Sequence, residues 1–567
     1  MIAAGTTSLI AATAAGPARA AGRGRPEAGD GTPEQVHLTW GDDPSRTVVV
    51  SWASPGQAER PRVRIGQRVI AAAERAYTDT LSGAVTWTYH ARVDGLRPGA
   101  TYGYAVTADN DANAPDPFSA TFTTAPEGRA AFRFTSFGDL AALEAAPAGS
   151  YGPAAYAVGA VETFQPLFHL LNGDLAHAGL TQAALTQAAR AQAWRDFGNN
   201  VQASAANRPW LPVPGSHELE PGDGEQWLAS YLTRYALPPN EADGFEGRWY
   251  AFRVGTALFV CLSGDDVAFS GAAFSGAGGP GAGAPDPLPG SPPSAAGTAR
   301  YLRGYSGGAQ TRWLESTLAA ARADASIDWI VVQLHQCACS SAPAGGGSDL
   351  GVRQEWLPLF DTYEVDLVLS GHDVGYERSF PVRGFDSGAG TDTATGAAAD
   401  TRRPRPVTMV DSGVFDTSQG TVHLVLGGGG APGPDGPAGY GPAGYGPAGY
   451  GPAGYGPAAA GRVARVFTRL APPVPDQRAP GGGTRPAADA VEAATWSARR
   501  DTSTGYGIAV FDVSPGSEAG GQTSITVRYY HAVGADPVSP AAGDYTLFET
   551  FTLVRPRSDG RRWHPKG

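Results

Sequence analysis

Apolar residues between positions 33 and 126 alternate with polar residues or form short continuous runs, as in half-buried and buried β-strands. Glycine, proline, aspartate and serine separate these runs, as is usual at turns. The clearest runs are 35–41, 47–54, 86–96, 101–108 and 118–124. Several short strands in close succession predict a β-sandwich. Since His, Cys and carboxylate side chains do not cluster in this region, we expect a structural or docking module.

The pattern changes after residue 126, where short apolar strands alternate with longer segments of helical character. Residues 310–324 predict an amphipathic helix, because their larger apolar side chains share one face at helical spacing. The residues on that face are Trp313, Leu314, Leu318 and Ala321. Strands that alternate with helices indicate an α/β core.

Strand patterning returns near the end of the chain and closes this second domain. The strand-like segments there are 504–513, 524–533 and 545–554. We therefore predict a multidomain chain with an all-β sandwich at 33–126 and an α/β domain at 130–555. Residues 1–32 precede them as a signal-like or flexible segment, and 556–567 form a basic tail that we expect to be disordered.

Two low-complexity segments interrupt the second domain. Residues 271–298 are rich in Gly, Pro and Ala, and residues 431–459 contain the sequence Gly-Pro-Ala-Gly-Tyr four times. Residues 271–298 are interpreted as an insertion because this composition cannot pack a core. The five-residue period of 431–459 fits neither a strand nor a helix, so that segment is interpreted as a surface loop. The repeated tyrosines leave open a role in binding carbohydrate or a cell wall; they are Tyr440, Tyr445, Tyr450 and Tyr455.

The net charge of −12, from 54 acidic and 42 basic residues, argues against nonspecific binding to nucleic acid or to an anionic membrane. No segment approaches the roughly 20 apolar residues of a membrane span, so we expect no membrane insertion. Residues 1–24 resemble the apolar region of a secretory signal, with a small-residue cleavage site at 18–20. We predict a secreted or cell-envelope-associated protein; because the segment lacks a basic beginning, an Ala-rich flexible arm is the alternative.

The three cysteines, Cys261, Cys337 and Cys339, are too few for a disulfide framework and too scattered for a structural zinc site. The spacing of Cys337 and Cys339 is poor for an unstrained disulfide. We expect inert or partly oxidised thiols.

Five predicted strands of the second domain end in polar side chains that could bind a metal ion. These side chains are Asp139, Asp174 with His177 shortly after it, Ser216-His217-Glu218, His335 and His372. In α/β sheets, ligands bind outside the carboxyl ends of the strands. Aspartate and histidine together suit Zn, Fe or Mn, and a shared carboxylate can bridge two ions about 3.5–4 Å apart, an arrangement used to hydrolyse phosphate esters.

Each of these features also has a plainer interpretation. A single Gly-Asp after a strand is usually a turn, and a single buried histidine is usually only hydrogen-bonded. We assign the second interpretation to His169 and His423, which lie inside apolar runs. Five ligand-type residues in order, all at strand ends, favour a metal site instead.

Taken in order, these motifs resemble those of the calcineurin-like metallophosphoesterases. They are GD at 138–139, GD-x-x-H at 173–177, G-S-H-E at 215–218, a strand ending in His335, and G-H-D-x-x-Y-E-R at 371–378. The Tyr-Glu-Arg ending with a β-sandwich in front is most similar to the purple acid phosphatases, whose N-terminal domain is fibronectin type III-like. The resemblance covers residues 33–430 and 504–555, and implies a second domain with a β-sandwich core flanked by helices.

The resemblance implies that a first metal ion is bound by Asp139, by Asp174 as the bridging ligand, and by two further side chains. His177 stands where the family has a tyrosine ligand, and Val374 stands where the family has a histidine ligand. Imidazole can replace the tyrosine, but valine binds no metal. We therefore expect the first ion to be weakly bound.

The resemblance implies a second ion bound by Asp174, His335 and His372, with Ser216 in place of the family's asparagine. Two imidazoles and the bridging carboxylate are retained, so we expect this ion to be tightly bound. The shorter Ser216 side chain provides a weaker ligand than asparagine.

These features lead to the hypothesis of an acid-phosphatase-like phosphomonoesterase that hydrolyses small phosphate esters with metal-bound water or hydroxide, using Fe, Zn or Mn. The resemblance implies that His217 protonates the leaving group, and Glu218 is expected to orient His217. Two alternatives remain open. One is a catalytically weakened homologue that acts as an exported binding or cell-wall-associated protein, and the other is a diesterase that uses the same site.

Overall fold

The computed structural model describes most of the chain in separate stretches. These are residues 30–79, 83–113, 116–140, 152–178, 188–219, 228–269, 304–342, 347–392, 395–430, 465–471, 474–475, 484–485, 488–501, 505–532 and 545–560. The predicted signal at residues 1–24, the insertion at 271–298 and the tyrosine repeats at 431–459 lie outside the described residues.

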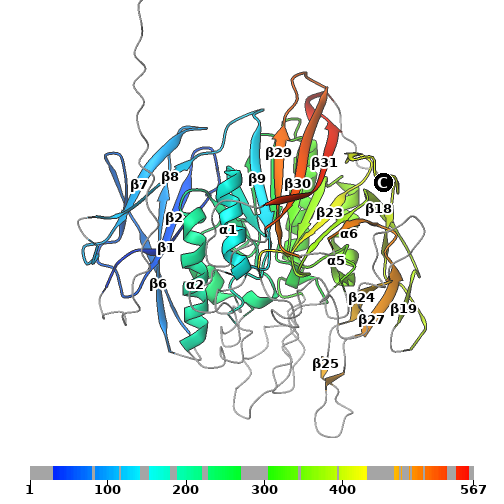
Figure 1. Ribbon diagram of the computed structural model, residues 1–567, viewed down its shortest axis with the longest axis horizontal. Helices are drawn as coiled ribbons and strands as arrows, with labels where there is room; N and C mark the ends of the chain where they lie inside the picture. The colour runs from blue at the N-terminus through cyan, green and yellow to red at the C-terminus, as the bar shows by residue number, and fades with distance from the viewer. Residues whose placement is uncertain are drawn as a thin grey trace, which may run out of the picture.

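The N-terminal domain consists of two four-stranded sheets, shown in blue at the left of Figure 1. The first has the order β1-β2-β6-β5 and the second the order β4-β3-β7-β8. Their strands are β1 (Glu34–Thr39), β2 (Val48–Ser54), β3 (Arg62–Ile65), β4 (Arg68–Ala71), β5 (Ala73–Thr78), β6 (Val85–Val93), β7 (Thr101–Thr107) and β8 (Phe118–Thr123). The predicted all-β domain is confirmed. Strands β4 and β5 were not predicted because most of their side chains are exposed, so they lack the apolar pattern of a buried strand.

The second domain is built on two seven-stranded mixed sheets. The first has the order β11-β10-β9-β29-β30-β31-β22 and the second the order β12-β13-β14-β16-β23-β17-β28. The strands of the first are β9 (Phe132–Phe137), β10 (Phe168–Leu171), β11 (Trp210–Pro212), β22 (Val414–Asp416), β29 (Gly507–Ser514), β30 (Gln522–His531) and β31 (Thr546–Pro556). Those of the second are β12 (Tyr250–Val254), β13 (Ala257–Cys261), β14 (Trp329–Gln333), β16 (Leu367–Ser370), β17 (Tyr376–Ser379), β23 (Val422–Leu426) and β28 (Ser497–Arg500).

The two sheets pack face to face through aromatic side chains. Phe134 of β9 stacks on Phe511 of β29, with ring centroids 4.4 Å apart, and meets Phe259 of β13 edge to face at 5.1 Å. Such offset and edge-to-face pairs add to the stabilisation that apolar burial provides. The core between the sheets is therefore held by contacts between segments that are far apart in the sequence.

Helices cover the outer faces of both sheets. Helices α1 (Gly152–Phe164) and α2 (Ala188–Ala205) pack on the first sheet and lie beside the N-terminal domain (Figure 1). Helices α4 (Ala309–Ala323), α5 (Leu350–Glu355) and α6 (Leu357–Thr362) pack on the second sheet. Helix α4 confirms the helix predicted for residues 310–324, and the whole domain has the predicted β-sandwich core flanked by helices.

Smaller elements complete the described part of the second domain. A five-stranded sheet has the order β15-β24-β27-β19-β20, and two hairpins pair β18 with β21 and β25 with β26. Their bounds are β15 (Ser348–Asp349), β18 (Val382–Asp386), β19 (Gly390–Asp392), β20 (Ala398–Ala399), β21 (Arg403–Pro406), β24 (Arg465–Ala471), β25 (Val474–Pro475), β26 (Thr484–Arg485) and β27 (Ala488–Ala493). The short helices are α3 (Ala229–Arg234) and the 3₁₀ turns η2 (Ser216–Glu218), η4 (Gly264–Asp266) and η6 (Ser558–Gly560).

Parallel strands bring the expected site together. Strands β9, β10 and β11 run parallel in the first sheet, and β13, β14, β16 and β23 run parallel in the second. The carboxyl ends of parallel strands share one edge of a sheet, which is where α/β folds bind ligands.

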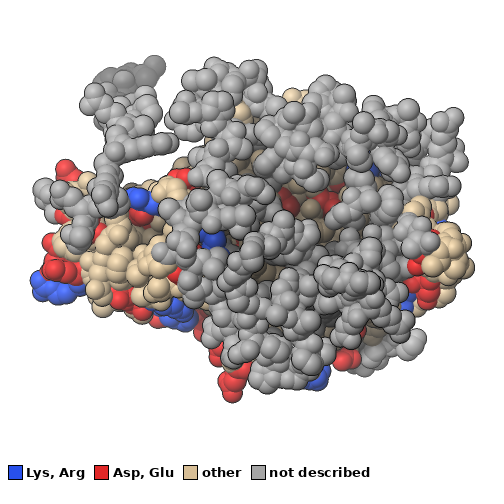
Figure 2. All heavy atoms as spheres, turned by 90° about the horizontal axis from the view of Figure 1, so that it is seen from below, with Lys and Arg blue, Asp and Glu red and all other residues tan. Residues whose placement is uncertain are grey.

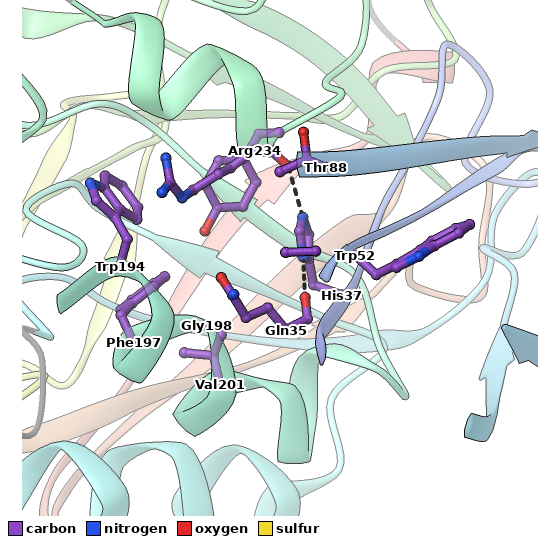
Figure 3. Close-up of a pocket in the computed structure, with 11 residues that line it drawn as sticks. Gln35, His37, Trp52, Thr88, Trp194, Phe197, Gly198, Val201 and Arg234 are labelled. Atoms are coloured by element: carbon purple, nitrogen blue, oxygen red, sulfur yellow. Dashed lines mark hydrogen bonds between the residues drawn. The ribbon is translucent and has the colours of Figure 1, made fainter. Parts of the chain in front are cut away.

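The N-terminal domain packs against α2 and α3 of the second domain. Figure 3 shows a cavity of about 20 Å³ at this contact, which has room for roughly one water molecule. The imidazole of His37, from β1, lies in it with Nδ1 2.8 Å from the Gln35 carbonyl oxygen and Nε2 3.1 Å from that of Arg234. On the face seen in Figure 2, basic and acidic side chains of the N-terminal domain are interspersed.

The end of the chain differs from the prediction of a disordered tail at 556–567. Strand β31 continues to Pro556, and the backbone N–H of Ser558 donates to Oδ1 of Asp328 at 2.8 Å. Arg557 forms an ion pair with Asp559 at 2.6 Å. The prediction is wrong for residues 556–560, because the basic composition of the tail did not reveal its buried acidic partner; 561–567 lie outside the described residues.

All three cysteines are buried free thiols. Within the described residues, no helix is both long enough and apolar enough to cross a membrane.

Candidate metal centre

The structure brings the polar strand ends to one edge of the two sheets. Asp139 follows β9, Asp174 follows β10, the turn η2 follows β11, His335 follows β14 and His372 follows β16. Within this cluster, two groups of three side chains each bring one ligand atom per residue within 4.8 Å of one another. Asp174 belongs to both groups, and each group adds two histidines to it.

Four of the candidate ligands have a left-handed backbone conformation. Their φ angles are 58° for Asp139, 52° for Asp174, 50° for His177 and 67° for His372. Residues other than glycine rarely adopt this conformation, and aspartate and histidine are among those that tolerate it best. Strained residues of this kind cluster at functional sites, where the surrounding structure holds them.

Asp174 lies at the centre of the cluster and is almost completely buried. Its Oδ1 accepts a hydrogen bond from the backbone N–H of His217 at 2.9 Å and a longer one from the Ser216 hydroxyl at 3.4 Å. Its Oδ2 lies 3.0 Å from Nε2 of His335 and 3.5 Å from Nε2 of His217. Two imidazoles therefore converge on one oxygen of the carboxylate, and each belongs to a different group.

The first group consists of Asp174, His335 and His372. The two rings are nearly perpendicular, with centroids 5.2 Å apart. Nδ1 of His335 lies 2.8 Å from the carbonyl oxygen of Asn172, so this nitrogen donates and Nε2 is left to bind a metal. Since the His335 side chain is completely buried, its orientation is fixed before any ion binds.

The second group consists of Asp174, His177 and His217. The two imidazole rings lie 4.4 Å apart and are inclined by 32°. His217 is partly exposed, with 20% of its side chain accessible to solvent. The family resemblance implied that His177 and Asp139 bind the same first ion. It did not predict that His177 and His217 lie together.

Asp139 is in neither group. Its Oδ2 accepts the backbone N–H of His372 at 2.9 Å, so this carboxylate holds the loop that carries His372. The neighbouring Asp373 is also engaged, because both of its oxygens accept the backbone N–H of Gly347 at 3.0 Å and one accepts the hydroxyl of Ser340. Asp373 therefore holds the loop that contains Ser340 and Gly347.

Glu218 holds the backbone of the site. Its carboxylate accepts three backbone N–H groups, from Asp174 at 2.9 Å, Leu175 at 2.8 Å and Gly215 at 2.7 Å. Nδ1 of His217 has no hydrogen-bond partner among the described residues. The Glu218 carboxylate ties the loop of Asp174 to the loop that carries His217.

Burial and mutual attraction set the ionisation of these groups. Burial disfavours a charged Asp174, but the imidazoles of His217 and His335 outweigh it and hold its pKa well below the ordinary value. Burial likewise disfavours a charged His335, yet Asp174 raises its pKa to about 10. Burial lowers the pKa of His177 to about 3, and the neighbouring His217 adds to this shift. Burial and the Asp174 charge raise the pKa of Glu218 to about 8.

The donor atoms fit a transition metal. Nε2 of His177 and Nε2 of His372 are buried without a hydrogen-bond partner among the described residues, although such atoms are normally paired. Imidazole nitrogens together with a carboxylate suit Zn, Fe or Mn. Metal binding therefore accounts for polar atoms that the described protein contacts leave unpaired.

Two further strand ends contribute to the site, and neither was identified from the sequence. Residues 427–430 are four glycines after β23, and the N–H of Gly429 donates to the carbonyl oxygen of Gly138 at 2.8 Å. A Cβ at Gly427 would lie 2.4 Å from the Asp373 carbonyl oxygen, so no larger residue fits this approach. Asp265, after β13, is buried and accepts a hydrogen bond from Gln336 at 2.8 Å. Both positions have the feature that identified the five predicted ligand positions in the sequence. That feature is an apolar strand that ends in a polar or glycine-rich segment.

The two histidines that were assigned no role lie in neither group. His169 is buried, with Nδ1 2.9 Å from the hydroxyl of Thr135, and His423 is buried within β23.

Known protein families match the chain in the same two parts. Residues 33–125 match the purple acid phosphatase N-terminal domain, and residues 132–376 match the calcineurin-like phosphoesterases. An uncharacterized protein of Mycobacterium tuberculosis is 36% identical over 574 residues, covering 98% of this chain and 93% of that protein. The chain belongs to the purple-acid-phosphatase-like calcineurin-like phosphoesterases. This family hydrolyses phosphate esters with a dinuclear metal centre.

More distant relatives agree with this assignment. A phosphoenolpyruvate phosphatase of Allium cepa is 25% identical, over 62% of this chain and 64% of that protein. Purple acid phosphatase 1 of Ipomoea batatas is 23% identical, over 62% and 65%. The structure of a purple acid phosphatase from yellow lupin seeds has the same fold, with a TM-score of 0.57 at 17% identity, over 93% of this chain and 75% of that one.

Proposed function

We propose that the protein is a phosphomonoesterase that acts on small phosphate esters. The observation that carries this proposal is the buried Asp174 carboxylate, which belongs to two groups that each add two imidazoles to it. Asp174, His335 and His372, with Ser216 beside them, would hold a catalytic ion. When bound there, a Zn, Fe or Mn ion polarises the phosphoryl oxygen and makes water a stronger nucleophile.

His217 is proposed to protonate the leaving oxygen of the ester. Its side chain is partly exposed, and its backbone N–H donates to Oδ1 of Asp174 at 2.9 Å. Glu218 supports this role through the backbone, because it holds the loop on which His217 lies. Asp139 holds the loop of His372 in the same way.

The test compares two substrates in the His217→Ala variant. General acid catalysis typically contributes about 10²–10⁴-fold, so turnover of an alkyl phosphate should fall by about that factor. Turnover of p-nitrophenyl phosphate should fall much less, because its leaving group needs little protonation. His423→Leu, which removes a buried imidazole outside the cluster, serves as the control. Equal losses on both substrates would exclude the proton-donor role.

The substitutions at Ser216 and Val374 favour one rival, a weakened homologue that binds and does not hydrolyse. An assay of the purified protein with added Zn, Mn or Fe separates the two. Turnover of a phosphate monoester supports the enzyme, whereas no turnover with any of these metals supports the binding protein. Export of either protein is a further part of the proposal, which rests on the signal-like sequence at residues 1–24.

A further inference from the structure

Asp265 and Gln336 form a buried pair of side chains beside the metal centre, and the proposed function does not use them. Asp265 belongs to the turn η4 after β13, and Gln336 directly follows the candidate ligand His335. Nε2 of Gln336 donates to Oδ1 of Asp265 at 2.8 Å. Both side chains are almost completely buried. A buried donor or acceptor that loses its partner costs free energy, so this contact is expected to persist.

The turn that carries Asp265 is anchored by helix α4. Gln310 of this helix binds both backbone groups of Ser263, which directly precedes the turn. Its Oε1 accepts the Ser263 N–H at 2.8 Å, and its Nε2 donates to the Ser263 carbonyl oxygen at 3.1 Å. The same Nε2 donates to Oδ2 of Asp266 at 3.1 Å, and this oxygen also accepts the hydroxyl of Ser306 at 2.6 Å. These contacts hold η4 in place without a bound ion.

The side chain of Gln336 packs closely against this turn. A Cβ at Gly264 would lie 1.9 Å from Oε1 of Gln336, so no larger residue fits there. Oε1 of Gln336 and Oδ2 of Asp265 have no hydrogen-bond partner among the described residues. Close packing and the single hydrogen bond to Oδ1 therefore fix the Gln336 amide relative to η4.

We propose that Asp265 is a positioning residue for the candidate metal ligand His335, and that it acts through Gln336. A ligand keeps its geometry when the side chains behind it are locked by packing and hydrogen bonds. Because Gln336 is fixed, the backbone of the adjacent His335 is fixed with it. Contacts behind a ligand typically change metal affinity by about 10–100-fold. This inference rests on the part of the proposed function that places an ion at His335.

The experiment measures Co²⁺ binding to the metal-free full chain by calorimetric titration. Asp265→Ala removes the acceptor of the contact, and Gln336→Leu removes its donor. Each change should weaken the tightest binding step by about 10–100-fold. The double variant should bind no more weakly than either single variant, because both changes break the same contact. Additive losses in the double variant would overturn the proposal.

Asp265→Asn separates the position of the side chain from its charge. Asparagine keeps an oxygen that accepts from Gln336 but removes the negative charge. Its Co²⁺ affinity should therefore fall by less than the about 10-fold that marks a lost outer contact. A loss as large as that of Asp265→Ala would show that the carboxylate acts through its charge, which would contradict a positioning role.

Thr311→Val is the matched control for a purely structural effect. Oγ1 of Thr311, on α4, accepts the indole N–H of Trp356 at 3.1 Å, a contact that does not involve η4. This variant should unfold at lower urea concentration than the wild type, yet its Co²⁺ affinity should be unchanged. If its affinity falls as much as that of Asp265→Ala, the loss reflects general destabilisation and the proposal fails.

The remaining outcomes separate this inference from the proposed function. Unchanged Co²⁺ affinity in Asp265→Ala would overturn the positioning role alone. A wild-type chain that binds no Co²⁺ would contradict both the positioning role and the ion proposed at His335. If Asp265→Ala does not fold, Gln336→Leu tests the same contact from its other side, and unchanged affinity there has the same meaning.

Discussion

Asp174 connects the two halves of the metal centre. Its left-handed backbone turns the chain at the end of β10, and its two oxygens reach the loops of His217 and His335. The neighbouring glycine is needed for close approach as well as for the turn. Gly173 has a φ of 82°, and a Cβ there would lie 2.6 Å from Nδ1 of His335.

Replacing Asp174 with asparagine should reduce metal binding more than any other single change in the centre. The amide keeps the shape of the side chain but removes the charge that two ions would share. Since even outer contacts change metal affinity by about 10–100-fold, we expect a loss of more than about 100-fold. Elemental analysis and calorimetric titration measure it, with Ser216→Ala as the milder comparison. A variant with the metal content of the wild type would show that Asp174 is not a bridging ligand.

At the scale of elements, α3 depends on the N-terminal domain. This short helix ends at Arg234, and side chains of the sandwich meet the carbonyl oxygens at its end. The hydroxyl of Thr88 lies 2.9 Å from the Thr233 carbonyl oxygen, and Nε2 of His90 lies at the same distance from it. Carbonyl groups at the end of a helix have no partner within the helix, so they need such donors. On its other side, α3 reaches the end of β11, because the Tyr231 hydroxyl donates to the Pro212 carbonyl oxygen at 3.0 Å.

Thr88→Val should therefore destabilise the protein with little effect on metal binding. Valine has nearly the same shape but no hydroxyl, and loss of a buried hydrogen bond costs about 1–2 kcal/mol. Urea unfolding measures the change. Thr86→Val is the matched control, because Thr86 lies two residues earlier on β6 and makes no side-chain hydrogen bond within the described part of the chain. Equal destabilisation by the two changes would show that the contact with α3 contributes nothing.

At the scale of the whole molecule, buried histidines line the contact between the two domains. His37 and His90 both have lowered pKa values because burial disfavours the charged imidazole. The pKa of His90 falls to about 3, and the nearby Arg75 adds to the effect of burial. In the unfolded chain this imidazole takes up a proton near pH 6.5. Below that pH the unfolded state binds more protons, so the free energy of unfolding decreases as the pH falls from 6.5 towards 3.

This linkage predicts that the protein loses stability in acid through the domain contact. His90 alone should lower the free energy of unfolding by about 2 kcal/mol between pH 7 and pH 5. In His90→Asn, which has no titrating group there, the difference between these two pH values should be smaller by that amount. Between pH 8 and pH 7 the two proteins should change in parallel. An unchanged pH dependence in the variant would mean that His90 is not buried in its neutral form.

The sequence by itself determined the features that depend on local pattern. Alternating and continuous apolar runs predicted five strands of the first domain (β1, β2, β6, β7 and β8), the ligand-bearing strands β9, β10, β11, β14 and β16, and the closing strands β29, β30 and β31. The helical spacing at 310–324 predicted α4. The strand ends predicted the positions of Asp174, His335 and His372, because parallel strands deliver their carboxyl ends to a common edge. The same rule applied to β13 and β23 would have found Asp265 and the four glycines. Exposed strands such as β4 escaped prediction because solvent imposes no apolar pattern on them.

The tertiary structure alone decided which side chains meet. His177 and His217 lie on loops after different strands, and their contact at 4.4 Å depends on how those loops fold over the edge of the sheet. The sequence showed Glu218 beside His217, but only the fold turned its carboxylate towards the backbone of Asp174. Periodicity records which face of an element is buried. It does not record which polar atoms from distant elements share that burial, and the chemistry of this centre depends on those atoms.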